Sequence, residues 1–366
     1  MKQCEITIIG CGVVGAAIAY ELSSIENLQI TVIDKNPPAT GATKAALGVL
    51  MGAISRKTKG RAWRLRETSL NRYQSLIPEL EARTGLNIAV NHQGIFKLLF
   101  AGDRLDKWQE LQALRKSQGW QLELGDRDYV KRQCPHLVND SIIGAVYSPQ
   151  DKQINPVRLT QALVAAARQN GVNFCFKVEC ESFITAKENN LLTCKYLETS
   201  AGTIRTDYLI VAAGLGSTTL TASLQQEINI RPVLGQAIKL QLDKYLGRED
   251  FQPVITGNDI HIVPLGNSEY WLGATVEFPT EMAEPIADAQ MLEELIAGAI
   301  AFCPTLTNAK ILEAWSGKRP RPEGRSAPVI DKLTGYNNVL LATGHYRNGV
   351  LLAPATALEI KQMLNV

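Results

Sequence analysis

A glycine-rich segment near the N-terminus constrains the fold more than any other feature of the sequence. Residues 4–10 predict a short buried strand, and the G-x-G-x-x-G motif at residues 10–15 opens a helix that continues to about Ser24. A second strand, residues 29–33, is followed at once by Asp34. Strand, helix, strand and acidic residue in this order predict a βαβ unit that binds a dinucleotide.

Each glycine of the motif has a physical task in such a unit. Gly10 makes the tight turn, Gly12 lets the backbone approach a pyrophosphate, and Gly15 lets the helix pack closely on the strand. The pyrophosphate is expected at the helix N-terminus, where unpaired N–H groups and the helix dipole favour negative charge. Asp34 is expected to accept hydrogen bonds from a ribose diol.

The motif alone does not distinguish NAD from FAD. Residues 41–48, Gly-Ala-Thr-Lys-Ala-Ala-Leu-Gly, form either a plain surface loop or a small-residue loop that runs close along an extended ligand. In the second case we expect the Thr43 hydroxyl to be free to bond a phosphate. A further buried strand, residues 208–214, ends in a glycine turn that can bring more backbone against the same ligand.

Composition narrows the class of protein. A chain of 366 residues fits about two domains. The 38 basic and 36 acidic residues nearly balance, which argues against a dedicated nucleic-acid binder. The seven cysteines include no C-x-x-C pair and the four histidines lack metal-ligating spacing, so we predict no metal site and the reduced thiols of a cytoplasmic protein. The uncharged stretch 6–20 is shorter than the ~18 residues of a transmembrane helix, and we expect no transmembrane segment.

The order of the remaining elements predicts two interleaved domains. Strands typical of the nucleotide fold recur at the beginning, middle and end of the chain, with β-rich blocks between them. We predict a discontinuous cofactor domain of residues 1–85, 151–220 and 310–366, and a substrate domain of residues 86–150 and 221–309. Near the C-terminus we expect strands at 311–315 and 339–342, then a helix at 351–364 with Pro354 in its first turn.

A basic run from Arg56 to Arg66 precedes a helix that continues to about Arg83. Two interpretations are open. The run is either a solvated helix face or an entrance that attracts anionic substrates or an acidic partner.

The C-terminal region carries the most specific pattern. Residues 343–356, Thr-Gly-His-Tyr-Arg-Asn-Gly-Val-Leu-Leu-Ala-Pro-Ala-Thr, resemble the closing motif of glycine oxidases, within the D-amino-acid oxidase family of FAD-dependent amine oxidoreductases. Further features match in order along nearly the whole chain: the fingerprint with Asp34, and segments 41–52, 211–216, 262–264 and 315–320. The resemblance implies an α/β fold, with a glutathione-reductase-type FAD-binding Rossmann domain and a second, mainly antiparallel β-sheet substrate domain.

The resemblance also implies the chemistry. A small amino acid (glycine, sarcosine or a D-amino acid) would lose a hydride from Cα to flavin N5, and hydrolysis of the imine would give an oxo acid and ammonia. Molecular oxygen would be the acceptor and would leave as hydrogen peroxide, and imine formed from glycine would suit thiamine biosynthesis. The FAD is expected to be non-covalent, because residues 321–326 lack the cysteine that sarcosine oxidases use.

Three alternatives remain within this resemblance. A dehydrogenase of the same fold would pass electrons to a quinone or carrier rather than to oxygen. A flavin-holding sensor would have no turnover, although Arg319 and Arg347 argue against it because a sensor needs no carboxylate clamp. The family also allows a homo-oligomer, for which the sequence offers no recognisable interface.

Three residues are expected to bind the substrate. Arg319 and Arg347 match active-site arginines of the family, and only arginine offers a planar, permanently charged fork to a carboxylate. His261 stands where the family has a tyrosine, and we expect its charge to change near pH ~6.5. Because the loop after Arg319 is one residue longer than the family pattern, Arg321 or Arg325 can share its role. No catalytic acid or base is assigned, since a neutral amine needs none.

The fingerprint and the resemblance together imply a set of cofactor-binding residues. A helix beginning near Val350 would direct its positive end at the preceding turn and hold negative charge on a reduced flavin. The complete set is Gly10, Gly12, Val13, Val14, Gly15, Asp34, Lys35, Thr43, Ala45, Ala46, Gly48, Val178, Ala213, Gly214, Gly344, His345, Tyr346, Arg347, Asn348, Gly349 and Val350.

Overall fold

The computed structural model describes residues 3–280 and 283–364, and its first layer is a six-stranded sheet. The strand order is β19-β20-β13-β1-β2-β9, and every neighbouring pair is parallel except β19 with β20. The strands are β1 (Cys4–Ile9), β2 (Leu28–Asp34), β9 (Asn173–Phe176), β13 (Tyr208–Val211), β19 (Val329–Lys332) and β20 (Val339–Thr343). The turns after β1, β13 and β20 therefore meet at the carboxyl edge, where open α/β sheets bind ligands.

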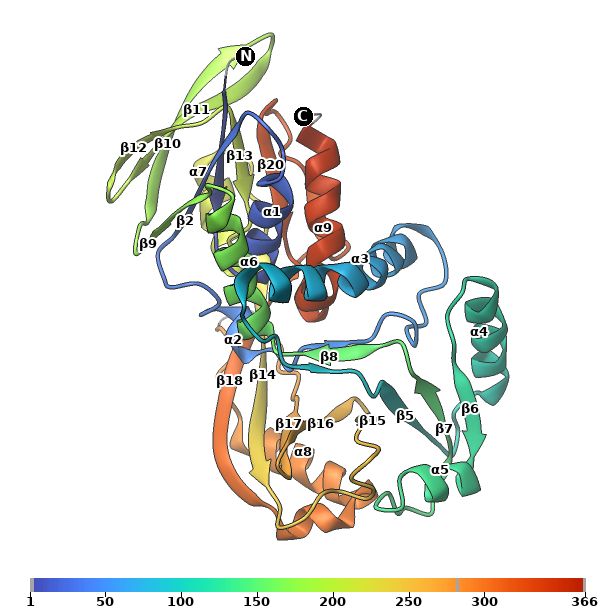
Figure 1. Ribbon diagram of the computed structural model, residues 1–366. Coiled ribbons are helices and arrows are strands. Elements are labelled where there is room, and N and C mark those ends of the chain that lie inside the picture. The colour runs from blue at the N-terminus through green and yellow to red at the C-terminus, as the bar shows by residue number, and fades with distance from the viewer. Residues whose placement is uncertain (1–2, 281–282, 365–366) are drawn as a thin grey trace.

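Different layers cover the two faces of this sheet (Figure 1). One face packs against four helices: α1 (Val13–Leu22), α3 (Gly60–Thr84), α6 (Pro156–Gln169) and α9 (Gly349–Leu364). The other face packs against the antiparallel strands β10 (Cys180–Glu188), β11 (Leu191–Thr199) and β12 (Gly202–Arg205), with α7 (Ser217–Ser223) beside them. Burial on both faces explains why the parallel strands read as continuous apolar runs.

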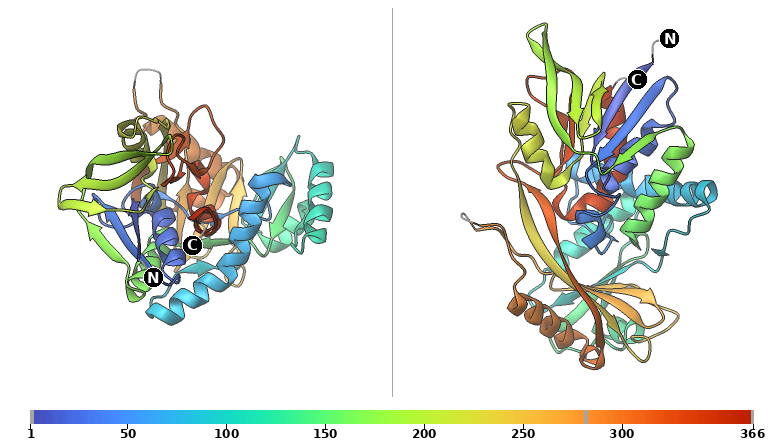
Figure 2. Two further views of the ribbon diagram at one scale, coloured as in Figure 1. Left: turned by 90° about the horizontal axis from the view of Figure 1, so that it is seen from above. Right: turned by 90° about the vertical axis from the view of Figure 1, so that its left-hand side faces the viewer.

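The second large layer is an eight-stranded sheet at the other end of the molecule (Figures 1 and 2). It is antiparallel apart from the parallel pair of β15 and β5. One face packs against α5 (Arg127–Gln133) and α8 (Ala289–Phe302). Its strands, in order, are β18 (Lys310–Pro322), β14 (Ile230–Gln241), β17 (Glu269–Gly273), β16 (Ile260–Gly266), β15 (Val254–Gly257), β5 (Ile95–Phe100), β7 (Ile142–Ser148) and β6 (Glu123–Asp126).

Short elements complete the chain. Strands β3 (Val49–Leu50), β8 (Lys152–Ile154) and β4 (Val90–Asn91) form a small antiparallel sheet between the two large ones (Figure 1). Helix α4 (Leu105–Ser117) packs beside β6. The remaining short helices are α2 (Ala42–Ala45), η1 (Gly214–Gly216), η2 (Pro304–Asn308) and η3 (Tyr346–Asn348).

The predicted fold class is confirmed, and one predicted segment lies elsewhere. The strand expected at 311–315 extends to Pro322 and pairs with β14 over its whole length, so residues 310–322 belong to the eight-stranded sheet. We expected the cofactor domain to resume at residue 310. Strand β18 begins at that residue, and it lies in the other sheet. Gly317, Pro320 and Pro322 are residue types that weaken a strand, so the sequence pattern did not show that the strand continues past Trp315.

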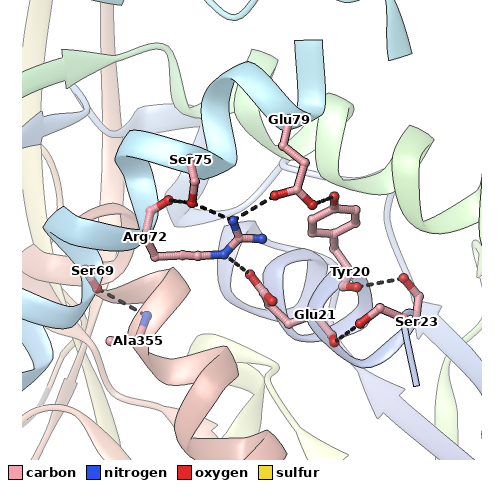
Figure 3. Close-up of polar contacts among 9 residues, drawn as sticks. Tyr20, Glu21, Ser23, Ser69, Arg72, Ser75, Glu79 and Ala355 are labelled. Atoms are coloured by element: carbon pink, nitrogen blue, oxygen red, sulfur yellow. Dashed lines mark hydrogen bonds and ion pairs between the residues drawn. The ribbon is translucent and has the colours of Figure 1, made fainter. Parts of the chain in front are cut away.

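The expectation for Pro354 is wrong. Helix α9 begins at Gly349, two residues earlier than predicted, so Pro354 lies in its second turn and cannot donate to the carbonyl of Val350. Helix α3 supplies the missing partner, because the Tyr73 hydroxyl donates to the Val350 oxygen at 2.5 Å. The next amide, of Ala355, donates to Ser69 Oγ at 3.2 Å (Figure 3).

Helix α3 is also tied to α1 by a half-buried ion network (Figure 3). Arg72 Nε donates to Glu21 Oε1 at 2.6 Å, and Arg72 Nη1 donates to Glu79 Oε2 at 2.8 Å. The Tyr20 hydroxyl donates to the other oxygen of Glu79. The helix that opens from the fingerprint is therefore held from behind by α3.

Several expected absences can be examined only in residues 3–280 and 283–364. In that part of the chain no helix is long and apolar enough to cross a membrane. The same residues contain no group of three histidine, cysteine, aspartate or glutamate side chains arranged to hold a metal ion. The seven cysteines are free thiols.

Candidate active site

The fingerprint turn is shaped by close backbone contacts. Gly10 has a φ of 105°, and a Cβ on it would overlap the carbonyl of Ala212 at the end of β13. A Cβ on Gly15 would overlap the carbonyl oxygen of Gly10. Both glycines are therefore required for β1, α1 and β13 to converge, as the motif predicts.

Two polar side chains brace this turn. The Asp34 carboxylate accepts from the amides of Cys11 at 2.7 Å and Asn36 at 2.8 Å. Thr43 Oγ1 accepts a hydrogen bond from the amide of Val13 at 3.0 Å. The hydroxyl was expected to be free, and it already has this one partner. The hydroxyl oxygen of Thr43 is bound to the first turn of α1, and the hydroxyl proton can still be donated to a phosphate. Gly10, Gly12, Asp34 and Thr43 are called the fingerprint end below.

A cavity of about 640 Å³ begins at the fingerprint end and reaches the eight-stranded sheet. Nearly all the predicted cofactor residues line it, from Gly10 to the turn at 344–350. Gly15 and Asn348 are the exceptions: Gly15 packs behind the turn, and Asn348 Oδ1 accepts from Arg66 Nη2 at 3.5 Å. The lining also includes Gly235, Ala237, Asp259 and Ala274, which the sequence did not point to.

The far wall of the cavity is one face of the eight-stranded sheet. Strand register places Ala237, Gly273, His261 and Thr256 side by side across β14, β17, β16 and β15. On β18, Gly317 and Arg319 lie on the same face as Trp315 because side chains alternate along a strand. His261, Arg319 and Arg347 are called the sheet end below.

Arg319 is held in a fixed orientation at this wall. Its Nη1 donates to the carbonyl of Leu234 at 2.9 Å, and its Nη2 donates to the carbonyl of Thr275 at 3.0 Å. A Cβ on Gly235 would overlap the guanidinium, so glycine there makes room for it. Burial, and then the nearby charge of Arg347, lower the pKa of Arg319 from its ordinary value. A guanidinium stays charged even so, and its remaining N–H groups suit a carboxylate.

Arg347 lies on η3 and also lines the cavity. Its side chain is 41% exposed, and its nearest acid is Asp259, with 3.9 Å between Nη1 and Oδ2. Such an open, loose pair contributes little energy and leaves the guanidinium available. The structure thus brings Arg319 of β18 and Arg347 of η3 to one cavity.

His261 does not behave as its sequence position suggested. Its Nδ1 lies 3.0 Å from Thr256 Oγ1, with the two residues paired across β16 and β15. Burial, together with the cations Lys97, Arg347 and Arg319, lowers the pKa of His261 to about 4, against an opposing effect of Asp259. The expected change of charge near pH ~6.5 is therefore wrong. The ring is neutral at physiological pH and acts as a hydrogen-bonding group.

The turn before α9 is held by a buried histidine. His345 is buried, with Nε2 2.9 Å from Thr356 Oγ1, and burial lowers its pKa to about 3. Gly344 has a φ of 65° and Tyr346 a φ of 54°. Gly349 and Val350 begin α9 and line the cavity. The helix N-terminus therefore offers positive potential to the middle of the cavity, as predicted.

The predicted basic run does not line this cavity, although Arg66 contacts Asn348 in the turn beside it. Arg61 Nη2 is 2.8 Å from Glu359 Oε2, and Arg64 Nη2 is 3.6 Å from Glu359 Oε1, so both arginines join α3 to α9. Within the described residues, the run from Arg56 to Arg66 contributes nothing to the cavity lining. Arg321 and Arg325 are exposed and also lie outside the lining.

The cavity fits a flavin dinucleotide. One end offers a helix N-terminus and an acid at the tip of β2, which suit a pyrophosphate and a ribose. The loop at 41–48 runs along it, and Ala45 is close enough to Gly317 that a Cβ there would overlap it. The other end offers a second helix N-terminus and two arginines, beside which a redox ring and a small anion can lie together.

Comparison with known proteins identifies the family to which a protein with this cavity belongs. The model of the DAO family, described as FAD dependent oxidoreductase, matches residues 5–363. This chain belongs to the DAO family. It is an FAD-dependent amino-acid oxidoreductase.

Individual relatives of this DAO-family chain agree. The glycine oxidase of Geobacillus kaustophilus is 26% identical over 360 residues, covering 98% of this chain and 92% of that protein. The bifunctional protein ThiO/ThiG of a Nostoc species is 29% identical over 360 residues, covering 98% of this chain and 52% of that longer protein. The crystal structure of the Geobacillus kaustophilus glycine oxidase matches with a TM-score of 0.86 and 25% identity, covering 100% of this chain and 95% of that one.

Proposed function

We propose that the protein oxidatively deaminates a small amino acid, such as glycine, sarcosine or a D-amino acid. A primary amino acid, oxygen and water would give an oxo acid, ammonia and hydrogen peroxide, and sarcosine would release methylamine in place of ammonia. The observation that carries the proposal is the Arg319 guanidinium at the cavity wall, fixed by two main-chain carbonyls. The likeness to glycine oxidases supports a small substrate.

The side chains of the cavity divide the work. Arg319 binds the substrate carboxylate through N–H groups that the protein does not use, and Arg347 contributes a second charge to the same cavity. His261 offers a neutral ring to the substrate. FAD, when bound, supplies the two-electron oxidation of the carbon–nitrogen bond. Gly10, Gly12, Asp34 and Thr43 would hold its nucleotide part, and the N-terminus of α9 would face its ring.

Two wider statements belong to the same proposal. The six-stranded sheet would form the cofactor domain and the eight-stranded sheet the substrate domain, with β18 counted in the latter. The likeness to ThiO/ThiG supports a role in thiamine biosynthesis, with glycine as the substrate.

A panel of amino acids with a peroxide readout tests the proposal. The purified protein should be yellow, should lose its flavin on denaturation in acid, and should form peroxide with glycine, sarcosine or D-alanine. Reduction of a dye or quinone with negligible oxygen consumption would point to the dehydrogenase instead. A protein that cannot take up FAD, or that oxidises none of these amino acids with either acceptor, would refute the proposal.

A further inference from the structure

Glu277 carries a buried carboxylate that lies just behind the cavity wall. Glu277 is 6% exposed. It lies a few residues after β17 and does not line the cavity. Gln236 Nε2 and the amide of Asp288 each donate to it at 3.0 Å, and the Thr275 hydroxyl donates as well. In the described part of the chain no lysine or arginine forms an ion pair with it. Burial of a carboxylate is costly, so this position calls for an explanation.

Both carbonyls that hold Arg319 belong to residues bound by Glu277. The guanidinium donates to the carbonyls of Leu234 and Thr275. Leu234 and Glu277 exchange two backbone hydrogen bonds, of 2.9 Å and 3.0 Å. Thr275 is held through its hydroxyl, which donates to the Glu277 carboxylate. Glu277 therefore contacts both residues on which the orientation of the guanidinium depends, Leu234 through its main chain and Thr275 through its carboxylate.

The charges agree with this geometry. Arg319 is a half-buried cation in a cavity that a second cation, Arg347, also lines. Burial and Arg347 lower the pKa of Arg319, while the negative charge of Glu277 opposes that shift. The carboxylate is too well occupied by its three donors to leave its place and bind Arg319 directly. It thus stabilises the cation without taking up the N–H groups that a substrate carboxylate needs.

We propose that Glu277 is a positioning residue for carboxylate recognition: it fixes the carbonyls of Leu234 and Thr275 and supplies the buried charge that keeps the Arg319 guanidinium turned toward the cavity. It does not touch the substrate. This inference rests on the proposed function, because it assigns Arg319 to a substrate carboxylate.

The Glu277→Gln variant of the FAD-loaded enzyme tests the inference. Poor placement of Arg319 weakens the binding of substrate and transition state alike, so KM for the amino acid should rise ~10-fold while kcat changes less than ~2-fold. The Kd of acetate, a carboxylate without a reactive amine, should rise by a similar factor when followed by the flavin absorbance spectrum. The Glu277→Asp variant keeps the charge and should recover part of the affinity.

A matched control separates position from general damage. Glu284→Gln removes an exposed carboxylate whose partner is Lys318, next to Arg319 in sequence, and should leave KM and the acetate Kd unchanged. If Glu277→Gln does not fold, Thr275→Val removes the hydroxyl link to Glu277, together with the 2.8 Å bond that this hydroxyl accepts from the Gln236 amide, and should raise the acetate Kd ~3-fold.

The outcomes distinguish this inference from the proposed function. A lower Tm with an acetate Kd within ~2-fold of the wild type would leave Glu277 a purely structural residue and would overturn the inference. So would an unchanged Kd in Thr275→Val where the glutamine variant fails to fold. Failure of the wild-type enzyme to oxidise any amino acid would instead overturn the proposed function, and acetate binding would still report on Glu277.

Discussion

The two ends of the cavity are built from different kinds of contact. At the fingerprint end, the groups that face a ligand are backbone amides and a braced carboxylate within one βαβ unit, and the fit depends on missing side chains. At the sheet end, the groups are two arginine side chains from β18 and η3 and the neutral imidazole of β16, and the placement of the groups on the strands depends on strand register and on hydrogen bonds. One end is local in sequence and the other is not.

This difference predicts how each end fails. Damage to the fingerprint end acts through backbone overlap and should remove cofactor and stability together. Damage to the sheet end should leave a folded flavoprotein that binds its substrate poorly. The predictions below separate these two behaviours.

Gly15→Ala should have the largest effect. Its Cβ would overlap the carbonyl oxygen of Gly10, so β1 and α1 must move apart, at a cost of about 3 kcal/mol or more in the free energy of unfolding. FAD content per chain should fall with it. Gly216→Ala is the matched control, because Gly216 lines the same cavity in a helical conformation with its nearest neighbour 3.6 Å away. Denaturant unfolding and flavin absorbance measure both, and equal behaviour of the two variants would break the comparison.

Arg319→Lys should leave the flavin in place and lower kcat/KM by ~10²- to 10³-fold. Lysine keeps the charge but cannot bind two carbonyls and a carboxylate at once. Arg321→Lys changes an exposed neighbour whose guanidinium lies 5.5 Å from the ring of Phe278, and it should change kcat/KM little. Steady-state kinetics on the flavin-saturated enzymes measures both. A larger loss of kcat/KM in Arg321→Lys than in Arg319→Lys would indicate that Arg321, in the loop after Arg319, binds the substrate carboxylate.

The same division explains what the sequence could predict. The fingerprint end could be predicted from the sequence because strand, turn, helix and acidic residue follow one another along the chain. The spacing of Gly10, Gly15 and Asp34 is set by the geometry of this unit. The bond from Val13 to Thr43 was not readable, because it joins two loops that meet only in the fold. At the sheet end the resemblance supplied Arg319, Arg347 and His261, and all three line the cavity.

What supports the sheet end was missed for a physical reason. Gly235 and Glu277 matter through register: Gly235 faces Gly317 across the β14–β18 pair, and Glu277 bridges to Leu234. Single-sequence periodicity shows that a strand alternates but not which residue lies opposite which. The low pKa of His261 likewise depends first on burial and then on three cations from β5, β18 and η3, neither of which a local pattern reveals.

Tyr73→Phe tests the element that serves both ends. The first turn of α9 lines the middle of the cavity, and the Val350 carbonyl, which loses its helical donor to Pro354, depends on the Tyr73 hydroxyl. Removal of the hydroxyl leaves a buried carbonyl unpaired and should lower the free energy of unfolding by about 1–2 kcal/mol. Pro354→Ala restores an amide donor, so the same change made in that background should cost less. A double-mutant cycle by denaturant unfolding measures the coupling, and strictly additive effects would contradict it.

His261→Gln should have the smallest effect on the pH dependence. With a pKa of about 4, the imidazole is neutral from pH 6 to pH 8 and becomes charged only as the pH falls further. Glutamine keeps a hydrogen-bonding group toward Thr256 and has no charge at any of these values. The profiles of log kcat/KM against pH for the two enzymes should therefore run parallel between pH 6 and pH 8, offset by a constant amount. An inflection near pH ~6.5 in the wild type that the variant loses would show that the imidazole titrates there. That result would mean that the charges of Lys97, Arg319 and Arg347 are screened at the sheet end, and that its electrostatics are closer to water than the burial of these groups implies.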